Sequence, residues 1–368
     1  MKISIASQRL ILLLIVISLV VRIFIAFGTG LGCYSVDSVN YINQAKALIA
    51  GNYLNYFPNG YPFIIAFTLL IDSFIRSEVF LILLNIALSS ASVYLVYIIS
   101  FSMIGNAGYS LIAAAVAAFY PNQLNYVRFI LTEVPAAFFL ILTLFLFIKE
   151  KNILSGLSLG FAAIIKSSLL PVAFLFSVYL FIKSKYIAGF KFLILSLVPL
   201  LIMLIYGYSK TGEWIIGKNF ANLLYFSSGV DSPDNLELQE AVKVYLDSAI
   251  KDPGNFLKER IISLWYFWGF LPPEGEGLRN SIFFRLLIGL RFLLVVLASY
   301  GFFYYKKNDV AIFLILPLIV LTIIHTLTYS EPRYTFPAEP FLIVLAVAAL
   351  KLIKEKSFIQ NSTLKIQN

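Results

Sequence analysis

Two carboxylates and several cations stand beside apolar segments of the sequence, where charged side chains are rare. Asp37 follows the first apolar run, Glu133 begins another within "YVRFILTEVPAAFF", and Lys166 lies between two more. The stretch "TYSEPRYTFP" adds Glu331 and Arg333 ahead of the last run. An ionisable group in such a position is costly unless it is paired or functional. Because Arg and Lys bind phosphate and a carboxylate can take a proton from a hydroxyl, these residues predict a site that handles an anionic phosphate.

The same segments hold the other candidates for this site. Asp37 and Glu133 are the catalytic candidates, and Arg128 joins Lys166 and Arg333 as a third cation for the phosphate. The side chains expected to line the site are aromatic or polar and come from the same loops: Tyr41, Tyr61, Tyr126, Glu331, Tyr334 and His325.

Structural roles are the alternative for the two carboxylates. Asp37 suits the N-cap of a helix that begins at Ser38, because its side chain can accept a hydrogen bond from the first turn. Glu133 suits either a helix cap or an ion pair with Arg128. Capping and catalysis are compatible, so both interpretations stay open.

The other charged residues have structural alternatives too. Arg333 and Glu331 are spaced as an ordinary interfacial ion pair, and His325 suits a structural hydrogen bond near a helix end. Arg22 lies in the outer half of the first apolar run, where a snorkelling or paired side chain is expected. No single motif here is specific, so the order of the motifs along the chain carries the weight.

The composition identifies the class of protein. The chain has 368 residues, of which 60% are hydrophobic and 13% charged, and its mean hydropathy is +0.88. A soluble domain would carry about 25% charged residues, so repeated apolar runs of about 20 residues predict a polytopic membrane protein.

The single cysteine and single histidine exclude an internal disulfide and a metal site with several histidines. The Lys and Arg residues behind the net charge of +9 lie at the ends of the apolar runs. This distribution is typical of residues that orient a protein in the membrane rather than of a nucleic-acid-binding surface.

The lysines determine the predicted orientation of the chain in the membrane. Apolar runs lie near 10–27, 61–75, 78–101, 108–120, 131–148, 153–165, 167–182, 188–207, 282–304, 309–327 and 336–353. The positive-inside rule places the clusters that flank these runs in the cytoplasm: Lys2/Arg9, Lys149/Lys151, Lys183/Lys185, Lys306/Lys307 and Lys351/Lys354/Lys356. Asp37 and Glu133 then both lie outside. Two residues on the same side of the membrane are separated by an even number of crossings, so one of the three apolar runs between them does not cross. The run 61–75 is predicted to lie in the outer leaflet, because its length of about 15 residues is short for a span.

The segment 153–182 is predicted to be a shortened helical pair with Lys166 at its outer apex. The expected fold is therefore an all-α membrane bundle with about ten transmembrane helices, external juxtamembrane helices and both termini in the cytoplasm. Its expected parts are an N-terminal transmembrane module with the active-site loops, an external helical region broken at "DPG", C-terminal transmembrane helices and a cytoplasmic tail: 1–207, 208–281, 282–354 and 355–368.

The order of these motifs resembles the GT-C superfamily of polytopic glycosyltransferases, in the branch that includes protein O-mannosyltransferases and the lipid A aminoarabinose transferase. The stretch "DSVNYINQAKALIAGNYLNYFPNGYPFIIAFTLLI" is similar to the family's first external loop, and "FYPNQLNYVRFILTEVPAAFFLIL" is similar to its second. Three further segments match in order: "GLSLGFAAIIKSSLLP", "DPGNFLKERIISLWYFW" and "HTLTYSEPRYTFPAEPFLIV". The resemblance covers most of the chain and is specific to the superfamily but not to a substrate.

The resemblance implies an inverting glycosyltransferase of the plasma membrane. Its donor would be a sugar on a polyprenyl phosphate, undecaprenyl or dolichyl, and its acceptor a hydroxyl of a lipid, protein or glycan on the extracytoplasmic face. Asp37 matches the first-loop acid, which the resemblance implies to be the general base or a metal-linked acid, and Glu133 matches the second-loop acid. Lys166 and Arg333 match basic residues near the donor phosphate. Some members have paired acids in the first loop, whereas Ser38 follows Asp37 here.

Cofactor and function each leave alternatives open. Asp37 and Glu133 are able to share Mg²⁺ or Mn²⁺ through oxygen ligands, but without a DxD cluster a reaction that needs no metal is at least equally expected. A transporter or flippase of lipid-linked sugar is the alternative function, although transporters usually show repeated halves and the sequence shows no clear repeat. A scaffold that binds a partner through 208–281 is a third hypothesis.

Overall fold

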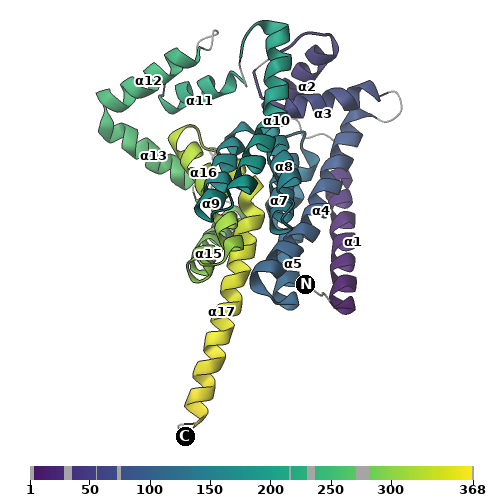
Figure 1. Cartoon of the computed structure of the whole chain (residues 1–368), viewed down its shortest axis with the longest axis vertical. Helices are drawn as coiled ribbons and strands as arrows, with labels where there is room; N and C mark the ends of the chain where they lie inside the picture. The colour runs from purple at the N-terminus through teal and green to yellow at the C-terminus, as the bar shows by residue number, and fades with distance from the viewer. Residues whose placement is uncertain are drawn as a thin grey trace.

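The computed structural model describes residues 4–28, 35–54, 56–72, 76–214, 217–229, 237–270 and 282–366 as an all-helical protein (Figure 1). Within these ranges there is no β-strand, so the predicted all-α class is confirmed. Apolar sequences form helices in a membrane because lipid offers no hydrogen-bond partners, and each backbone group must be satisfied within its own segment.

Six helices among the described residues are long and apolar enough to cross a membrane. They are α1 (Ile5–Gly28), α4 (Ser77–Ile104), α10 (Tyr186–Thr211), α15 (Ile282–Tyr305), α16 (Asp309–Leu327) and α17 (Glu339–Ile366). The mean hydropathy of their most apolar windows runs from 1.9 to 3.1. Since a hydrocarbon core about 30 Å thick needs about 20 such residues, the protein is membrane-embedded.

Helix α17 lies at the centre of the bundle. The apolar window that ends in this helix is 83% buried, compared with 22% for α1 and 17% for α15. It packs against α4, α15, α16 and the short helix α5 (Ala107–Phe119). The helix continues to Ile366 and projects beyond the bundle (Figure 1), so the segment predicted as a tail, 355–368, extends α17 over most of its length.

Among the described residues, four further apolar helices of 13 to 16 residues are shorter than a membrane span. These are α5, α7 (Glu133–Ile148), α8 (Asn152–Ile165) and α9 (Leu170–Ile182). Their 13 to 16 residues give about 20 to 24 Å of helix. Between α8 and α9 the chain leaves the α-helical conformation at Lys166 and makes one 3₁₀ turn, which agrees with the break predicted within 153–182.

Glycines allow α8 to approach α10 closely. A Cβ atom at Gly160 would lie 2.6 Å from the backbone oxygen of Ser196. One at Gly156 would lie 2.6 Å from the backbone oxygen of Phe192. Small residues four apart are typical of helix pairs in membranes, where close backbone approach increases van der Waals contact. This packing holds α8, and therefore Lys166 at its C-terminal end, in a defined position.

Two short helices form a platform at one end of the bundle: α2 (Val36–Ile49) and α3 (Gly60–Leu70). The buried Gln44 side chain joins them, because its amide donates hydrogen bonds to the backbone oxygen of Phe57 at 2.8 Å and to Oδ1 of Asn59 at 2.7 Å. A Cβ atom at Gly60 would lie 2.5 Å from the backbone oxygen of Ile164 in α8. The platform is thus packed against the end of α8.

Ser35 rather than Asp37 caps the first helix of the platform. The Ser35 hydroxyl accepts the backbone N–H of Ser38 at 3.2 Å, and the Ser38 hydroxyl accepts that of Ser35 at 3.1 Å. The prediction of an Asp37 cap is wrong because the helix begins earlier, at Val36. Asp37 instead lies in the first turn, where the helix dipole favours a negative charge, and its carboxylate is available for other contacts.

Three external helices form an arm on one side of the bundle (Figure 1): α11 (Asn219–Ser227), α12 (Leu238–Lys251) and α13 (Pro253–Phe267). The break between α12 and α13 falls at the predicted "DPG". There the Asp252 carboxylate accepts the backbone N–H of Asn255 at 3.0 Å, and Pro253 takes the first helical position, which suits its missing N–H.

The glycine packing between α8 and α10 gives a first prediction. We expect Gly160→Ala to lower the Tm of the purified protein in detergent by several degrees, because the added methyl group meets backbone and overpacking costs about 1–3 kcal/mol. Gly289→Ala is the control, since a Cβ atom there meets no atom within 4 Å and alanine favours a helix. Equal Tm values for the two variants would contradict the close approach of α8 and α10.

Candidate active site

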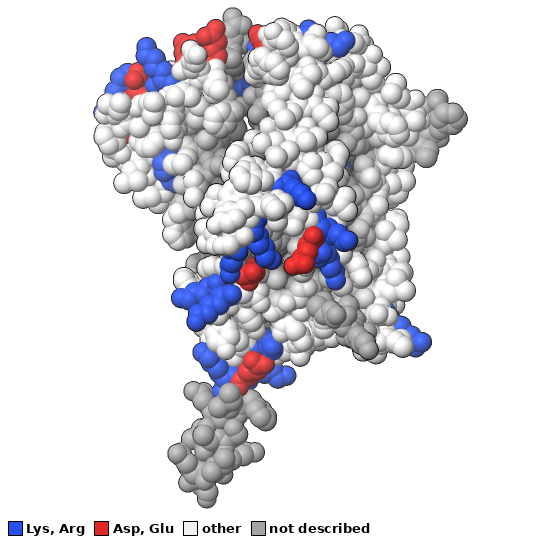
Figure 2. Space-filling view, in the orientation of Figure 1, with Lys and Arg blue, Asp and Glu red and all other residues white. Residues whose placement is uncertain are grey.

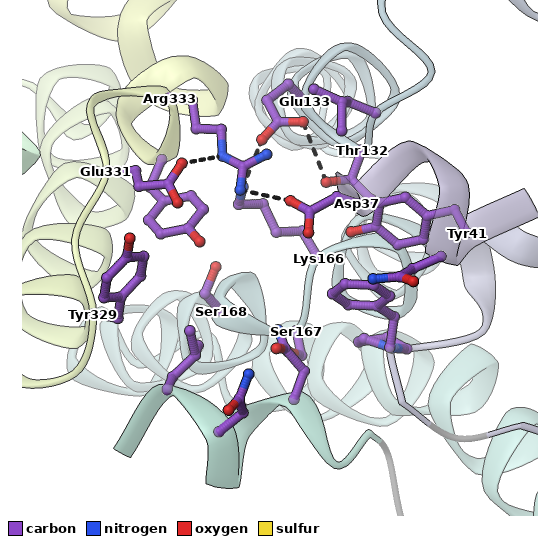
Figure 3. Close-up of a pocket in the computed structure, with 18 of the residues that line it drawn as sticks. Asp37, Tyr41, Thr132, Glu133, Lys166, Ser167, Ser168, Tyr329, Glu331 and Arg333 are labelled. Atoms are coloured by element: carbon purple, nitrogen blue, oxygen red, sulfur yellow. Dashed lines mark hydrogen bonds and ion pairs between the residues drawn. The ribbon is translucent and has the colours of Figure 1, made fainter. Parts of the chain in front are cut away.

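A cavity of about 320 Å³ lies where the platform, the junction between α8 and α9, and the segment before α17 meet (Figure 3). The side chains predicted to do chemistry line it together: Asp37, Glu133, Lys166, Glu331 and Arg333. They come from parts of the chain that are far apart in sequence. A concave site with a few convergent polar groups is the usual form of a ligand site.

Arg333 holds two of the carboxylates in this cavity. Its Nη2 lies 2.6 Å from Oδ2 of Asp37, and its Nε lies 2.5 Å from Oε2 of Glu331. The 3₁₀ segment η3 (Pro332–Ala338) carries Arg333 and packs against α7 and α16. The expected ion pair of Arg333 with Glu331 is confirmed. It belongs to a three-residue network that ties the platform to the C-terminal part of the chain.

Lys166 and Glu133 form a second pair, deeper in the protein. Lys166 Nζ lies 3.4 Å from Glu133 Oε1, and their side chains are only 9% and 3% exposed. Burial lowers the pKa of Lys166 below its usual value, and the Glu133 carboxylate opposes that shift. The Thr132 hydroxyl donates to the other Glu133 oxygen at 3.5 Å. Glu133 therefore pairs with Lys166 and occupies the first turn of α7, where the helix dipole favours its charge.

The ring of Tyr334 lies beside both cations. Lys166 Nζ is 4.7 Å from its centroid, and the guanidinium carbon of Arg333 is 5.4 Å from it. The electron-rich face of an aromatic ring attracts such cations. His325 stacks on the same ring at 4.3 Å between centroids, and its Nδ1 is 3.2 Å from the backbone oxygen of Tyr329. Tyr334 and His325 line the cavity as predicted, and His325 also has the expected structural contact.

The remaining predicted residues divide between the cavity and its surroundings. Tyr41 lines the cavity, and burial raises the pKa of its hydroxyl well above the usual value. Tyr61 is fully buried and packs edge-on against Tyr41 at 5.3 Å between ring centroids. Tyr126 borders a different cavity. Arg128 does not line this first cavity, and its guanidinium lies 5.2 Å from the centre of the Phe129 ring.

Several lining residues escaped the sequence analysis: Ser167, Ser168, Asn222, Phe226 and Tyr329. A signal existed for two of them. Asn222 and Phe226 are four residues apart, on one face of the amphipathic helix α11. The Asn222 amide donates to the Tyr56 hydroxyl at 3.0 Å, so α11 closes the cavity above the platform. Their distance in sequence from the platform concealed this contact.

The carboxylates of the cavity fit ion pairs better than a divalent cation. Within the described ranges, no three His, Cys, Asp or Glu side chains are grouped as a metal site requires. Asp37 and Glu133 each face a protein cation, Arg333 and Lys166 respectively. Mg²⁺ and Mn²⁺ favour several oxygen ligands arranged around one point, and this donor set does not provide them.

A second cavity, of about 700 Å³, lies on the other side of Arg333. Tyr329, Glu331 and Arg333 line both cavities. The rest of its wall comes from α6 (Pro121–Asn125), the end of α13 and the outer helix α15, from which Arg291 lines it as a further cation. This second cavity therefore connects an apolar outer helix with the cations of the site.

Comparisons with known proteins leave the chain without an assigned family. No known protein family matches the sequence, and a search of curated proteins found no significant match. The resemblance to the GT-C superfamily remains a prediction.

Because the Lys166–Glu133 pair is buried, breaking it should lower the stability of the protein strongly. We expect Lys166→Met to lower the Tm strongly in detergent, because breaking a buried pair costs about 3–5 kcal/mol when it leaves an unpaired charge. The double variant Lys166→Met/Glu133→Gln should recover part of that loss.

Lys183→Met is the matched control, since it breaks an exposed pair with Asp309 and such pairs contribute about 0–1 kcal/mol. Similar Tm shifts for Lys166→Met and Lys183→Met would show that the Lys166–Glu133 pair is not buried as described.

Proposed function

We propose that this protein is a GT-C-type membrane glycosyltransferase, which moves a sugar from a polyprenyl phosphate to an acceptor hydroxyl on the extracytoplasmic face. The observation that carries the proposal is the convergence of Asp37, Glu133, Lys166 and Arg333 on one cavity. Sugar transfer from a lipid phosphate needs a base for the acceptor hydroxyl and cations for the leaving phosphate. The order of motifs in the sequence supports the same assignment.

Asp37 is the general base in this proposal. Its side chain is 27% exposed, whereas that of Glu133 is 3% exposed and faces Lys166. The acceptor oxygen attacks the anomeric carbon on the face opposite the phosphate, and its proton passes to the Asp37 carboxylate. The bond between that carbon and the phosphate oxygen breaks, and its electron pair leaves with the phosphate. The configuration at the anomeric carbon inverts.

Lys166 and Arg333 stabilise the leaving phosphate, whose negative charge grows as the glycosidic bond breaks. Fixed cations in a site with little water are worth more than the same charges in bulk solvent. Glu133 is a positioning residue, because it holds the Lys166 ammonium toward the cavity. Tyr334 limits the mobility of both cations through its ring.

The second cavity provides an approach for the lipid part of the donor. It borders α15, whose membrane-length window is only 17% buried and therefore faces lipid. Arg333 lies between this cavity and the catalytic one. A polyprenyl chain held along α15 would present its phosphate to Arg333, with Arg291 as an additional cation. Arg291 replaces Arg128 as the third cation in this proposal.

The proposed topology places the site on the outer face of the plasma membrane, with ten crossings and both termini in the cytoplasm. The four short helices would complete the ten, and the platform would lie at the outer surface. Lys and Arg side chains outnumber acidic ones over the lower half of the bundle, the half from which α17 projects (Figure 2). That distribution supports a cytoplasmic assignment for this half.

Replacement of the base tests the proposal directly. In a deletion strain complemented with Asp37→Asn, we expect the glycan or glycolipid product to fall at least about 100-fold, since a general base contributes about 10²–10⁴-fold. Asp247→Asn is the matched control, because the same substitution is made on the external helix α12, away from the cavity. Mass spectrometry of glycans and glycolipids provides the measurement.

Two further variants separate the residues' roles. Lys166→Ala should also abolish the product, and Glu133→Gln should lower it, once membrane levels of each variant are matched to wild type. Normal product with Asp37→Asn would remove Asp37 as the base. Normal product with all three variants would exclude a glycosyltransferase that acts through this cavity.

A further inference from the structure

A third cavity, of about 830 Å³, lies between the external arm and residues 328–330. Its walls are the end of α11, the facing sides of α12 and α13, and that segment. It is more than twice as large as the catalytic cavity, which has about 320 Å³. Both volumes fall in the range of small-molecule sites, about 300–1,000 Å³. We call this third cavity the arm groove.

The arm groove adjoins the catalytic cavity at two aromatic rings. Phe226 and Tyr329 line both spaces, and their ring centroids are 5.9 Å apart at 44°. Tyr329 stands at the edge of the catalytic cavity in Figure 3. A molecule that occupies the groove therefore has a direct approach to Asp37 past these two rings.

The wall of the groove is rich in neutral hydrogen-bonding groups. Six serine and threonine side chains line it: Ser227, Ser228, Ser248, Ser263, Thr328 and Ser330. Five of these hydroxyls donate to backbone oxygens, so they offer their lone pairs as acceptors to a ligand. Asn255 adds an amide, and Asp252 and Glu259 add carboxylate acceptors. Such groups match the hydroxyls of a sugar. The two rings at the inner end match its apolar C–H face, because the face of an aromatic ring carries negative charge.

The buried cation of the groove is engaged in holding the arm. Arg260 is buried and donates to the backbone oxygens of Leu327 and Thr328 at 2.9 Å and of Ser227 at 2.8 Å. Lys251 also lines the groove, but its side chain is 79% exposed and lies 4.0 Å from Asp247 of the same helix. The two carboxylates of the wall, Asp252 and Glu259, therefore face one exposed ammonium, and this balance favours a neutral ligand over an anionic one.

The shape of the groove is fixed by these same contacts. The three Arg260 hydrogen bonds join α13 to the end of α11 and to the segment at 327–328. Tyr245 of α12 also donates to the backbone oxygen of Leu327, at 2.5 Å. A preformed groove binds its ligand with a smaller loss of conformational entropy.

We infer that the arm groove binds the acceptor and that the acceptor is a neutral sugar chain. This inference rests on the proposed transferase function, which makes the ligand of the groove the acceptor of the reaction. The chain lies between α12 and α13, its terminal sugar stacks on Phe226 and Tyr329, and a hydroxyl of that sugar reaches Asp37. The donor approaches from the opposite side of Arg333, through the second cavity.

Binding to an oligosaccharide panel tests the inference on the full-length protein in lipid nanodiscs. The panel holds neutral oligosaccharides of two to four hexose or N-acetylhexosamine units, acidic oligosaccharides with uronic acid or sulfate groups, and unglycosylated peptides. We expect binding to neutral oligosaccharides only, and at least tenfold weaker binding by the double variant Asn255→Ala/Glu259→Ala. Both residues are exposed, so the variant should fold. Lys258→Ala is the control, on the same helix outside the groove.

The outcomes distinguish the groove from the catalytic proposal. Binding only to acidic oligosaccharides or peptides, no binding at all, or unchanged binding by the double variant would overturn the inference. Asp37→Asn should still bind neutral oligosaccharides, because Asp37 contacts a single hydroxyl of the chain. If Asp37→Asn, Lys166→Ala and Glu133→Gln all leave the cellular product unchanged, the transferase proposal fails while the sugar-binding groove stands. If Asp37→Asn abolishes the product but the groove variant binds and transfers normally, the groove fails alone.

Discussion

The position of one guanidinium group determines how the parts of this protein meet. Arg333 pairs with Asp37 at 2.6 Å and with Glu331 at 2.5 Å. Asp37 belongs to the N-terminal platform, and Arg333 lies in η3, immediately before the most buried helix of the bundle. A guanidinium group suits this place because it is always charged and its fork of donors can serve two carboxylates at once. The cavity exists because these distant segments are drawn together around it.

The same requirement, that a charge removed from water find polar partners, recurs inside the bundle. Arg22 of α1 is fully buried and donates to the Ser89 hydroxyl at 2.9 Å and to the backbone oxygen of Ala118 at 3.0 Å. It thereby ties α1 to α4 and α5 instead of snorkelling. Arg291 of α15 pairs with Glu339 of α17. Leaving such charges unpaired in lipid is costly, so each one restricts how its helices can pack.

The sequence predicted the features that local chemistry decides. The length of the apolar runs predicted a membrane protein. The motif "DPG" predicted the break between two helices at Asp252, and the isolated Lys166 predicted the junction of α8 and α9. The side-chain partners of the acids depended on longer-range geometry. A pair between Glu133 and Arg128, five residues earlier, was one of the alternatives. In the structure Arg128 ends a 3₁₀ turn, the chain continues in an extended conformation at Phe129, and Arg128 does not line the cavity.

The contribution of the external arm was hidden for the same reason. Asn222 lies more than 160 residues from Tyr56, to which it is hydrogen-bonded, and no local pattern encodes that approach. The N-cap of α2 is a smaller difference between the sequence prediction and the structure. A Ser and an Asp two residues apart are both good caps, and only the hydrogen bonds of the folded helix show which of them serves.

The meeting of three cavities at Tyr329 suggests how a two-substrate reaction would be ordered. In this structure Arg333 pairs with Asp37, so the proposed base is held in an ion pair. A donor phosphate that enters beside Arg333 competes for the same guanidinium, and charge-assisted contacts of Arg with phosphate are strong and directional. Its arrival would weaken the hold on Asp37 at the moment when the leaving group comes within reach of Lys166. A transferase built in this way would deprotonate its acceptor only after the donor is in place, which would protect the activated sugar from premature reaction.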